Sequence, residues 1–167
     1  MNLGRVACTV FLLICAFAPD MALAKAPELA PANERATRVH VDKSDRALTL
    51  FRNDTPIASY RVKLGANPRG HKQAEGDERT PEGRYVLDYK NPNSGFHLSI
   101  HVSYPNESDR AAARAAGRDP GGEIMIHGGN RWWRFGNWTD GCIAVTDEEM
   151  EEIWRLVSPG TPIQIDP

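Results

Sequence analysis

The sequence predicts a mainly β domain with two short helices, arranged as a sandwich or a partly closed barrel. Apolar residues alternate with polar ones through residues 39–64, which is typical of half-buried strands. The short apolar run 123–126 is consistent with a buried strand, and a Thr-x-x-Glu capping box at 146–149 opens a helix. Periodicity gives this class and leaves the strand order open.

The strands follow in chain order from their alternation and from the turns between them. A first strand is centred on 39–41. A hairpin follows, with one strand around 48–50, a turn at 53–54 and a second strand over 58–64. Residues 65–79 are polar and glycine-bearing, so they predict an exposed loop. Further strands are expected at 84–89, 96–103, 123–126 and 161–165.

Two helices are expected between these strands. Ser108 is positioned to cap the first, over 109–116, and Gly117 stands at its stop position. The second begins at the capping box formed by Thr146 and Glu149, and its apolar residues repeat at helical spacing. That spacing favours a core role for Trp154 over a role as a ligand platform.

Residues 1–24 have the features of a secretory signal. A lone arginine precedes the apolar run 6–17, and an Ala-Leu-Ala triplet offers a cleavage site after Ala24. The alternative is an uncleaved anchor, although the run is shorter than the roughly 20 residues of a spanning helix. Residues 25–36, rich in Ala, Pro and Glu, predict a flexible linker, and 37–167 have the size of one domain.

The charge of the chain excludes a polycation built to bind nucleic acid. The formal net charge is −2, and it stays at −2 after signal removal, because residues 1–24 contain one Arg and one Asp. No later apolar run approaches membrane length, so no membrane span is expected beyond the signal. We expect the mature protein to be a monomer.

Cys142 is the only cysteine left once the signal is removed, in a chain bound for an oxidising compartment. Such a thiol is either used in chemistry or buried as a small core residue. His127 directly follows the apolar run 123–126, and one loop connects it to Gly141 and Cys142. Because an imidazole can take the proton of a thiol, these residues form a candidate nucleophile and base. The alternative is that His127 closes a strand and Cys142 belongs to the core.

Three motifs surround this pair: Ile126-His127-Gly128, Thr139-x-Gly141-Cys142-Ile143 and, upstream, Thr80-Pro81-x-Gly83-x-Tyr85. Together they resemble the L,D-transpeptidase catalytic domain (YkuD-type) family over residues 39–165. The resemblance implies a β-sandwich with mixed sheets. It also implies that Cys142 is the acylated nucleophile and His127 its general base and acid. The Gly128 carbonyl would orient the imidazole, and Gly141 would belong to the oxyanion site.

The chain departs from the family pattern beside the expected cleft. Asp140 stands where the family usually has a second histidine, and Ala144 stands where it often has an arginine. Asp140 is either a turn residue before glycine or a carboxylate that orients an amine or screens substrates by charge. Without the arginine, we expect the pocket to tolerate uncharged or amine-bearing groups better than free carboxylates.

Further candidate substrate contacts are Asp140, Thr139, Trp133, Trp138 and His101. Aromatic residues crowd the loop after His127, where they either pack the loop down or line a groove for sugar or peptide. His97 and His101 are four apart, which would place them on one face of a strand. No third metal ligand is clustered near them in the sequence, so hydrogen-bonded structural histidines are favoured over a metal pair.

The resemblance implies a cysteine-dependent L,D-transpeptidase that acts on peptidoglycan stem peptides through an acyl-enzyme thioester, in the periplasm or cell envelope. The acceptor would be an amine or water, and no metal or organic cofactor is implied. One alternative is a peptidase or amidase of the same fold that trims stem peptides or releases wall-linked protein. Another is an inactive wall-binding module, whose cysteine would have no reason to be activated.

Overall fold

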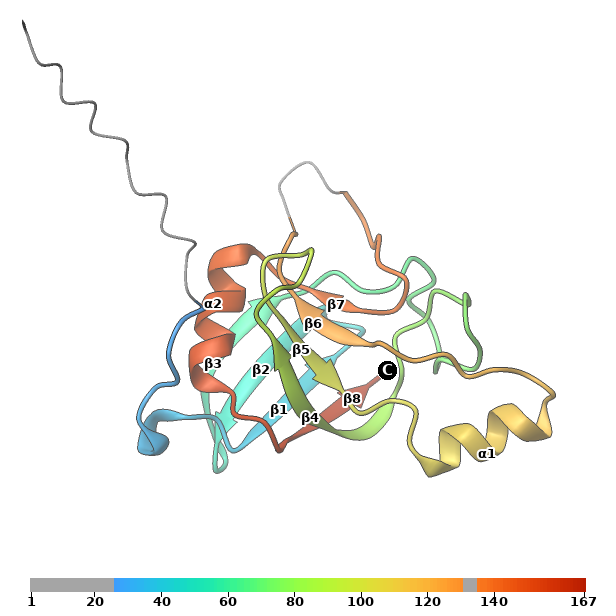
Figure 1. The fold of residues 1–167 in the computed structure, drawn as a ribbon, viewed down its shortest axis with the longest axis horizontal. Helices are drawn as coiled ribbons and strands as arrows, with labels where there is room; N and C mark the ends of the chain where they lie inside the picture. Colours follow the sequence, from blue (N-terminus) through green and yellow to red (C-terminus); the bar gives the residue numbers. More distant parts are fainter. Residues whose placement is uncertain (1–25, 131–134) are drawn as a thin grey trace, which may run out of the picture.

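The computed structural model describes residues 26–130 and 135–167, and there the predicted mainly β class with two α-helices is confirmed (Figure 1). The strands are β1 (Arg38–Asp42), β2 (Ala47–Arg52), β3 (Thr55–Arg61), β4 (Gly83–Asn91), β5 (Ser99–Val102), β6 (Met125–His127), β7 (Ile143–Ala144) and β8 (Thr161–Asp166). The helices are α1 (Glu107–Ala115), α2 (Asp147–Leu156) and a short 3-10 helix, η1 (Ala32–Glu34).

The strands form one mixed sheet in the order β3-β2-β1-β8-β4-β5-β6-β7. Strands β1 and β8 pair in parallel, as do β6 and β7, and the other neighbours are antiparallel. The predicted hairpin turn is present between β2 and β3, where Asn53 adopts a positive φ of 55°. Asparagine is one of the few residues that tolerate this conformation.

The sheet curls so that its two ends meet. The segment that follows β3 bridges to the far end of the sheet, with Lys63 opposite Ala144 and Gly65 opposite Thr139. Figure 1 shows the curl, with β1 to β3 on one side and β5 to β7 on the other. This closure, which periodicity could not predict, joins the chain near residue 63 to the strand that follows Cys142.

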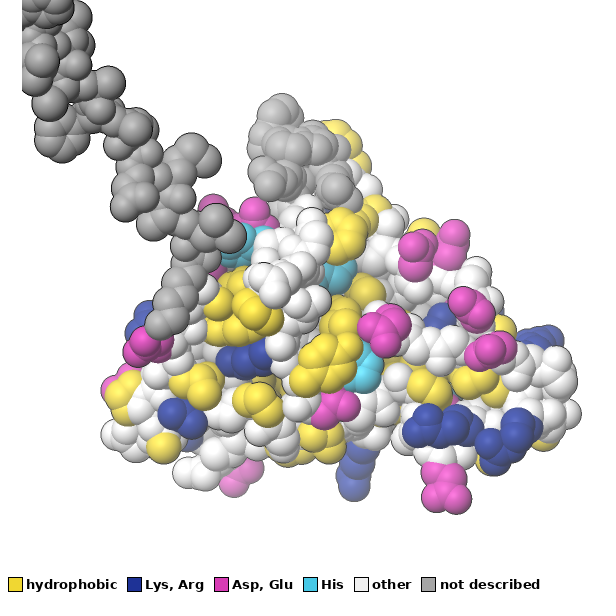
Figure 2. All heavy atoms as spheres, viewed as in Figure 1, with side chains coloured by type: hydrophobic (Ala, Val, Ile, Leu, Met, Phe, Trp, Pro, Cys, Tyr) yellow, Lys and Arg dark blue, Asp and Glu magenta, His cyan; other side chains and the backbone are white. Residues whose placement is uncertain are grey.

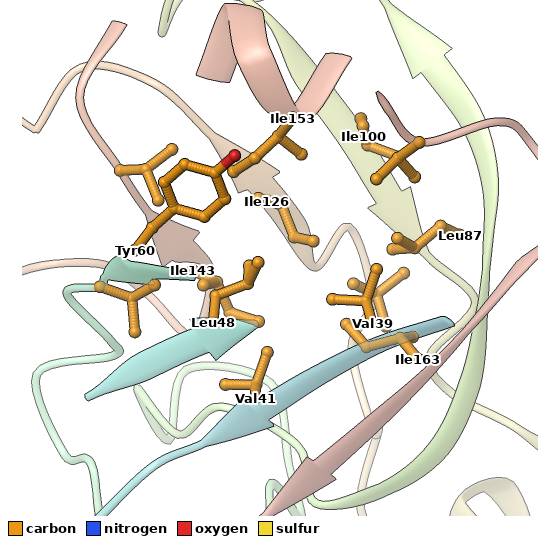
Figure 3. Close-up of a cluster of buried hydrophobic side chains, with 14 of the residues drawn as sticks. Val39, Val41, Leu48, Tyr60, Leu87, Ile100, Ile126, Ile143, Ile153 and Ile163 are labelled. Atoms are coloured by element: carbon orange, nitrogen blue, oxygen red, sulfur yellow. The ribbon is translucent and has the colours of Figure 1, made fainter. Parts of the chain in front are cut away.

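The inside of the curl holds the hydrophobic core. Figure 3 shows side chains from different strands of the curled sheet meeting in this core, among them Leu48, Val39, Ile126 and Ile143. Helix α2 covers the core with Met150, Ile153 and Trp154, all buried, which confirms the core role predicted for Trp154. Burial of apolar surface is the main term that favours this arrangement.

Both helices begin at capping boxes. Thr146 and Glu149 cap α2 as predicted. The prediction for α1 was wrong by two residues: Asn106, rather than Ser108, is its N-cap. The Asn106 side chain accepts from the Asp109 amide at 3.0 Å, and the Asp109 carboxylate accepts from the Asn106 amide at 2.9 Å. This reciprocal pair satisfies two backbone donors at once.

Part of the predicted linker 25–36 packs on the domain, which corrects that expectation from Ala30 onward. The Ala30 amide donates to the Arg155 carbonyl at 2.9 Å, and the Ala36 amide donates to the Leu156 carbonyl at 2.8 Å. Ala30 and Ala36 are both buried. The small side chains allow the backbone to approach the last turn of α2 and satisfy carbonyls that a helix end leaves open.

The predicted signal, residues 1–24, lies outside the described residues. Among the residues that are described, none of the helices has the length and apolar character needed to cross a membrane. Strand β5 is shorter than the predicted 96–103, because His97 adopts a positive φ of 72° and leaves the extended conformation before the strand begins.

Candidate active site

His127 is the last residue of β6 and lies on the outer face of the curled sheet. Its neighbour Ile126 pairs with Ile100 on β5 and Ile143 on β7, and all three isoleucines are fully buried in the core. Because successive residues of a strand point to opposite faces, His127 points away from that core. Its side chain is nevertheless covered, with 3% of its surface exposed.

Cys142 directly precedes β7 and lies on the same face. Ile143 pairs with Ile126, so Cys142 lies beside Met125, one strand away from His127 and diagonal to it. The Met125 amide donates to Cys142 Sγ at 3.3 Å, and the thiol donates to the Glu123 carbonyl at 3.6 Å. The thiol is partly exposed. The fold thus brings the predicted nucleophile and base together from positions 15 residues apart in the sequence.

Among the described residues, the Gly128 carbonyl and two aromatic rings contact the imidazole of His127. Its Nδ1 atom lies 2.6 Å from the Gly128 carbonyl oxygen. The Phe96 ring stacks on it with centroids 4.6 Å apart, and the Trp138 ring meets it edge-on at 5.7 Å. A carbonyl can only accept, so Nδ1 carries the hydrogen, and in the neutral ring Nε2 then has the lone pair. Histidine and hydrophobic side chains gather over β5 and β6 in the space-filling view (Figure 2).

The turn that carries Cys142 is closed by Thr139. The Thr139 hydroxyl donates to the Cys142 carbonyl at 2.7 Å and accepts from the Gly141 amide at 3.3 Å. Gly141 has a φ of 118°, and a Cβ at this position would lie 2.6 Å from the Arg79 carbonyl oxygen. Only glycine fits this position, because any side chain would meet both strain and a clash. The Thr80-Pro81 turn therefore packs directly behind the Gly-Cys turn.

Lys43 fixes the Thr80-Pro81 turn from the interior, a role that sequence reasoning missed. Its Nζ donates to the Gly70 carbonyl at 2.8 Å, the Thr80 carbonyl at 3.0 Å and Glu82 Oε1 at 2.7 Å. Only 2% of the lysine is exposed, and burial lowers its pKa against the opposing effect of Glu82. The sequence offers no signal for this contact, because a lysine after a strand usually points into solvent.

The loop after His127 is tied to the start of α2. The Gly129 amide donates to Asp147 Oδ1 at 2.6 Å, and the Asn130 amide donates to the Val145 carbonyl at 3.0 Å. At Gly128, a Cβ would lie 2.7 Å from the same Asp147 oxygen. Asp147 therefore helps fix the Gly128 carbonyl that contacts the imidazole. The sequence analysis did not predict this role of Asp147, because an acidic residue in the first turn of a helix is common.

The surroundings of Cys142 favour the thiol over the thiolate. Burial is the largest effect and raises its pKa above the ordinary range of cysteine, and the carboxylates of Asp140 and Glu123 add to it. The amide of Met125 opposes the shift by donating to the sulfur. A proton acceptor close to the sulfur is therefore needed before this thiol can act as a nucleophile.

The other predicted substrate contacts differ in their exposure and in their hydrogen-bond partners. Asp140 is exposed next to Cys142, whereas Thr139 is buried with its hydroxyl engaged in the turn. His101, on the same face as Met125, pairs with Asp88 at 2.7 Å. Trp133 lies outside the described residues, as does Trp132.

His97 and His101 do not share a strand face, which corrects that expectation. His97 lies before β5 with a positive φ, and its Nε2 is 2.9 Å from Glu151 Oε1 on α2. In the two described ranges, no group of three His, Cys, Asp or Glu residues is arranged to hold a metal ion. Both histidines instead have single carboxylate partners.

The comparisons with known proteins concern the domain as a whole. The family model of the L,D-transpeptidase catalytic domain (YkuD) matches residues 36–165, which is most of the chain. This chain belongs to the L,D-transpeptidase catalytic-domain family. Among curated proteins of this family, the candidate L,D-transpeptidase YafK of Escherichia coli (strain K12) is 28% identical over 126 residues. The match covers 72% of this chain and 46% of YafK.

Solved structures with the L,D-transpeptidase fold are similar to this domain. One is Pgp2 of Campylobacter jejuni, described as a helical cell shape determining protein, with a TM-score of 0.62 and 24% identity. Another is Bd1075 of Bdellovibrio bacteriovorus, with a TM-score of 0.58 and 22% identity. The matches cover 85% and 84% of this chain but only 51% of each neighbour. The chain thus spans about half the length of these relatives, and the likeness to them is one of fold.

Proposed function

We propose that this domain is a cysteine-dependent L,D-transpeptidase-type enzyme that acts on peptidoglycan stem peptides. The observation that carries the proposal is the placement of Cys142 and His127 on one face of adjacent strands, with Nδ1 of the imidazole fixed by the Gly128 carbonyl. This orientation directs the basic Nε2 of a neutral ring away from the backbone. Membership of the family supports an enzyme of the cell wall.

In the proposed reaction, His127 removes the thiol proton as the Cys142 sulfur attacks the carbonyl carbon of a stem-peptide amide. The new C–S bond gives a tetrahedral oxyanion, which backbone amides stabilise. The C–N bond then breaks, His127 gives its proton to the leaving amine, and a thioester remains. An amine acceptor or water then attacks the thioester carbon and gives up a proton to His127. The C–S bond breaks, and His127 returns this proton to the sulfur, which regenerates the free thiol.

The Cys142 amide is the better candidate for the oxyanion donor. The Gly141 amide already donates to Thr139 Oγ1, whereas the Cys142 amide has no acceptor within the described part of the chain. We therefore assign Gly141 and Thr139 to shaping the turn, and Asp140, Trp138 and, on sequence grounds alone, Trp133 to the substrate side. His101 borders the site through its pairing with Met125.

A hydrolase of the same fold is the second candidate. The observation that favours it is Asp140, whose exposed carboxylate stands next to the nucleophile where the family usually has histidine. A water acceptor would make the protein a peptidase or amidase that trims stem peptides or releases wall-linked protein. In either case we propose an exported protein of the periplasm or cell envelope, in line with the predicted signal.

Mass spectrometry of purified wall fragments incubated with the mature protein distinguishes the two reactions. New cross-links identify a transferase, whereas shortened or released peptides identify a hydrolase. Wall fragments that remain unchanged, together with an alkylation rate of Cys142 that is the same in the wild type and in His127→Gln, would leave only the inactive wall-binding module. The Cys142→Ala variant is the control, and activity in that variant would exclude a cysteine mechanism.

A further inference from the structure

A polar pocket of about 400 Å³ lies next to the loop that follows His127. Three cations line it, Arg46 at the start of the hairpin, Arg61 at the end of β3, and Lys63 beyond it. Asn130 and Asn137, from either side of the loop, complete its polar lining. The pocket thus lies between the end of the hairpin and the loop of the candidate active site.

The three cations of this pocket have no carboxylate partner within residues 26–130 and 135–167. The contrast with other lysines is clear, because Lys43 and Lys72 each pair with a carboxylate at 2.7 Å and 2.9 Å. A concave site lined by like charges, without internal compensation, raises the local concentration of anions and favours binding of an anionic group. The pocket therefore has the charge of a site for an anion.

Backbone pairing connects this pocket to the candidate catalytic residues. The Lys63 amide donates to the Ala144 carbonyl at 2.9 Å, and the Ala144 amide donates to the Lys63 carbonyl at 2.8 Å. Ala144 in turn pairs with His127. Directly opposed residues project from the same face, so Lys63, Ala144 and His127 form one row across the sheet. Two strand spacings separate the Cα atoms of Lys63 and His127 by about 10 Å.

We infer that this cationic pocket binds a free carboxylate of the substrate, which is an acidic peptide. At about 3.3 Å per extended residue, the carboxylate lies within about three residues of the amide that is cut. This inference rests on the proposed function and names its substrate class. It reverses the expectation drawn from Ala144 alone: the cation absent two residues after the cysteine is supplied by Lys63 from the neighbouring strand.

The binding test uses matched stem peptides with a free or an amidated carboxyl terminus. Calorimetry with the Cys142→Ala protein measures affinity without turnover. We expect the free carboxylate to bind about tenfold more tightly, as for a charge-assisted contact. Lys63→Met and Arg61→Gln should each remove most of this preference while leaving the amidated peptide unaffected. The matched control is Arg110→Gln, an exposed cation on α1, which should change neither affinity.

The outcomes separate this inference from the proposed function. Equal affinity for the two peptides would overturn the carboxylate site. So would an equal loss of affinity for both peptides in Lys63→Met, if the melting temperature of that variant is unchanged. If Lys63→Met melts at a lower temperature than the wild type, Arg61→Gln decides in the same way, because the exposed Arg61 side chain has no hydrogen-bond partner among the described residues. Turnover of both peptides by the wild type without preference would remove the inference alone. Neither binding nor turnover of either peptide would remove the proposed function as well.

Discussion

The Nδ1 atom of His127 lies 2.6 Å from the carbonyl oxygen of Gly128, the next residue in the chain. This contact selects the tautomer with its proton on Nδ1, which leaves Nε2 as the basic atom. Because the loop is fixed at Gly129 by Asp147, the carbonyl is held in place by α2 as well as by the strand. The imidazole is therefore oriented before any substrate binds.

His127→Gln should slow alkylation of Cys142 at neutral pH and lower turnover by about 10²–10⁴-fold, as expected for the loss of a general base. Iodoacetamide labelling followed by mass spectrometry measures the first effect. The control is His101→Gln, since His101 is engaged with Asp88 and has no proposed role in proton transfer. An unchanged alkylation rate in His127→Gln would show that another group activates the thiol.

Alkylation of Cys142 should keep rising at pH values above the ordinary pKa of cysteine, about 8.5. Burial raises the pKa of this thiol, and Asp140 adds to the shift. Asp140→Asn should therefore move the pH profile of the rate to lower pH, whereas Asp54→Asn, an exposed change in the β2–β3 turn, should not. A profile that stays in place in Asp140→Asn would mean that burial alone sets the shift.

The same shift has a consequence for stability. A thiol whose pKa is higher in the folded than in the unfolded chain stabilises the fold below the unfolded pKa. That contribution is lost as the pH rises through the folded pKa. Thermal melting at alkaline pH should therefore fall less steeply in Cys142→Ala than in the wild type, and parallel curves would contradict the raised pKa.

Gly141→Ala should destabilise the domain by about 2–4 kcal/mol, because it combines a positive φ with a clash against the backbone. The new Cβ would lie 2.6 Å from the Arg79 carbonyl oxygen. Gly76→Ala is the matched control: its φ is 74°, and its added Cβ meets nothing within 4 Å, so it should cost only about 1–2 kcal/mol. Denaturant unfolding measures both, and equal losses would show that the clash relaxes.

Trp138→Ala should weaken binding to wall fragments more than it lowers the melting temperature. Its ring borders the imidazole of His127 and the ring of Phe96 at the surface of the site. Trp154→Ala provides the contrast, since this buried residue should cost about 3–5 kcal/mol of stability. If Trp138→Ala loses as much stability as Trp154→Ala and its folded fraction binds wall fragments normally, then Trp138 packs against the loop and does not contact the substrate.

Local patterns were sufficient to predict the mainly β class, the β2–β3 hairpin and the capped start of α2. Each depends on residues close together in the chain, such as the reciprocal bonds of Thr146 and Glu149. The boundary of α1 was missed because Asn106 and Ser108 are both good caps, and only the position of Asp109 selects between them. Strand β7 was missed because two residues carry no periodicity.

The sequence by itself determined the identity of the candidate nucleophile and base. One cysteine outside the predicted signal, one histidine at the end of an apolar run, and the motifs around them were enough to assign the family that the family model also matches. The tertiary structure alone decided what surrounds that pair. Lys43 behind the Thr80-Pro81 turn and Lys63 beside Ala144 reach the site through contacts between distant segments. Closure of the sheet creates these contacts. No local sequence pattern determines which distant segments pair when the sheet closes.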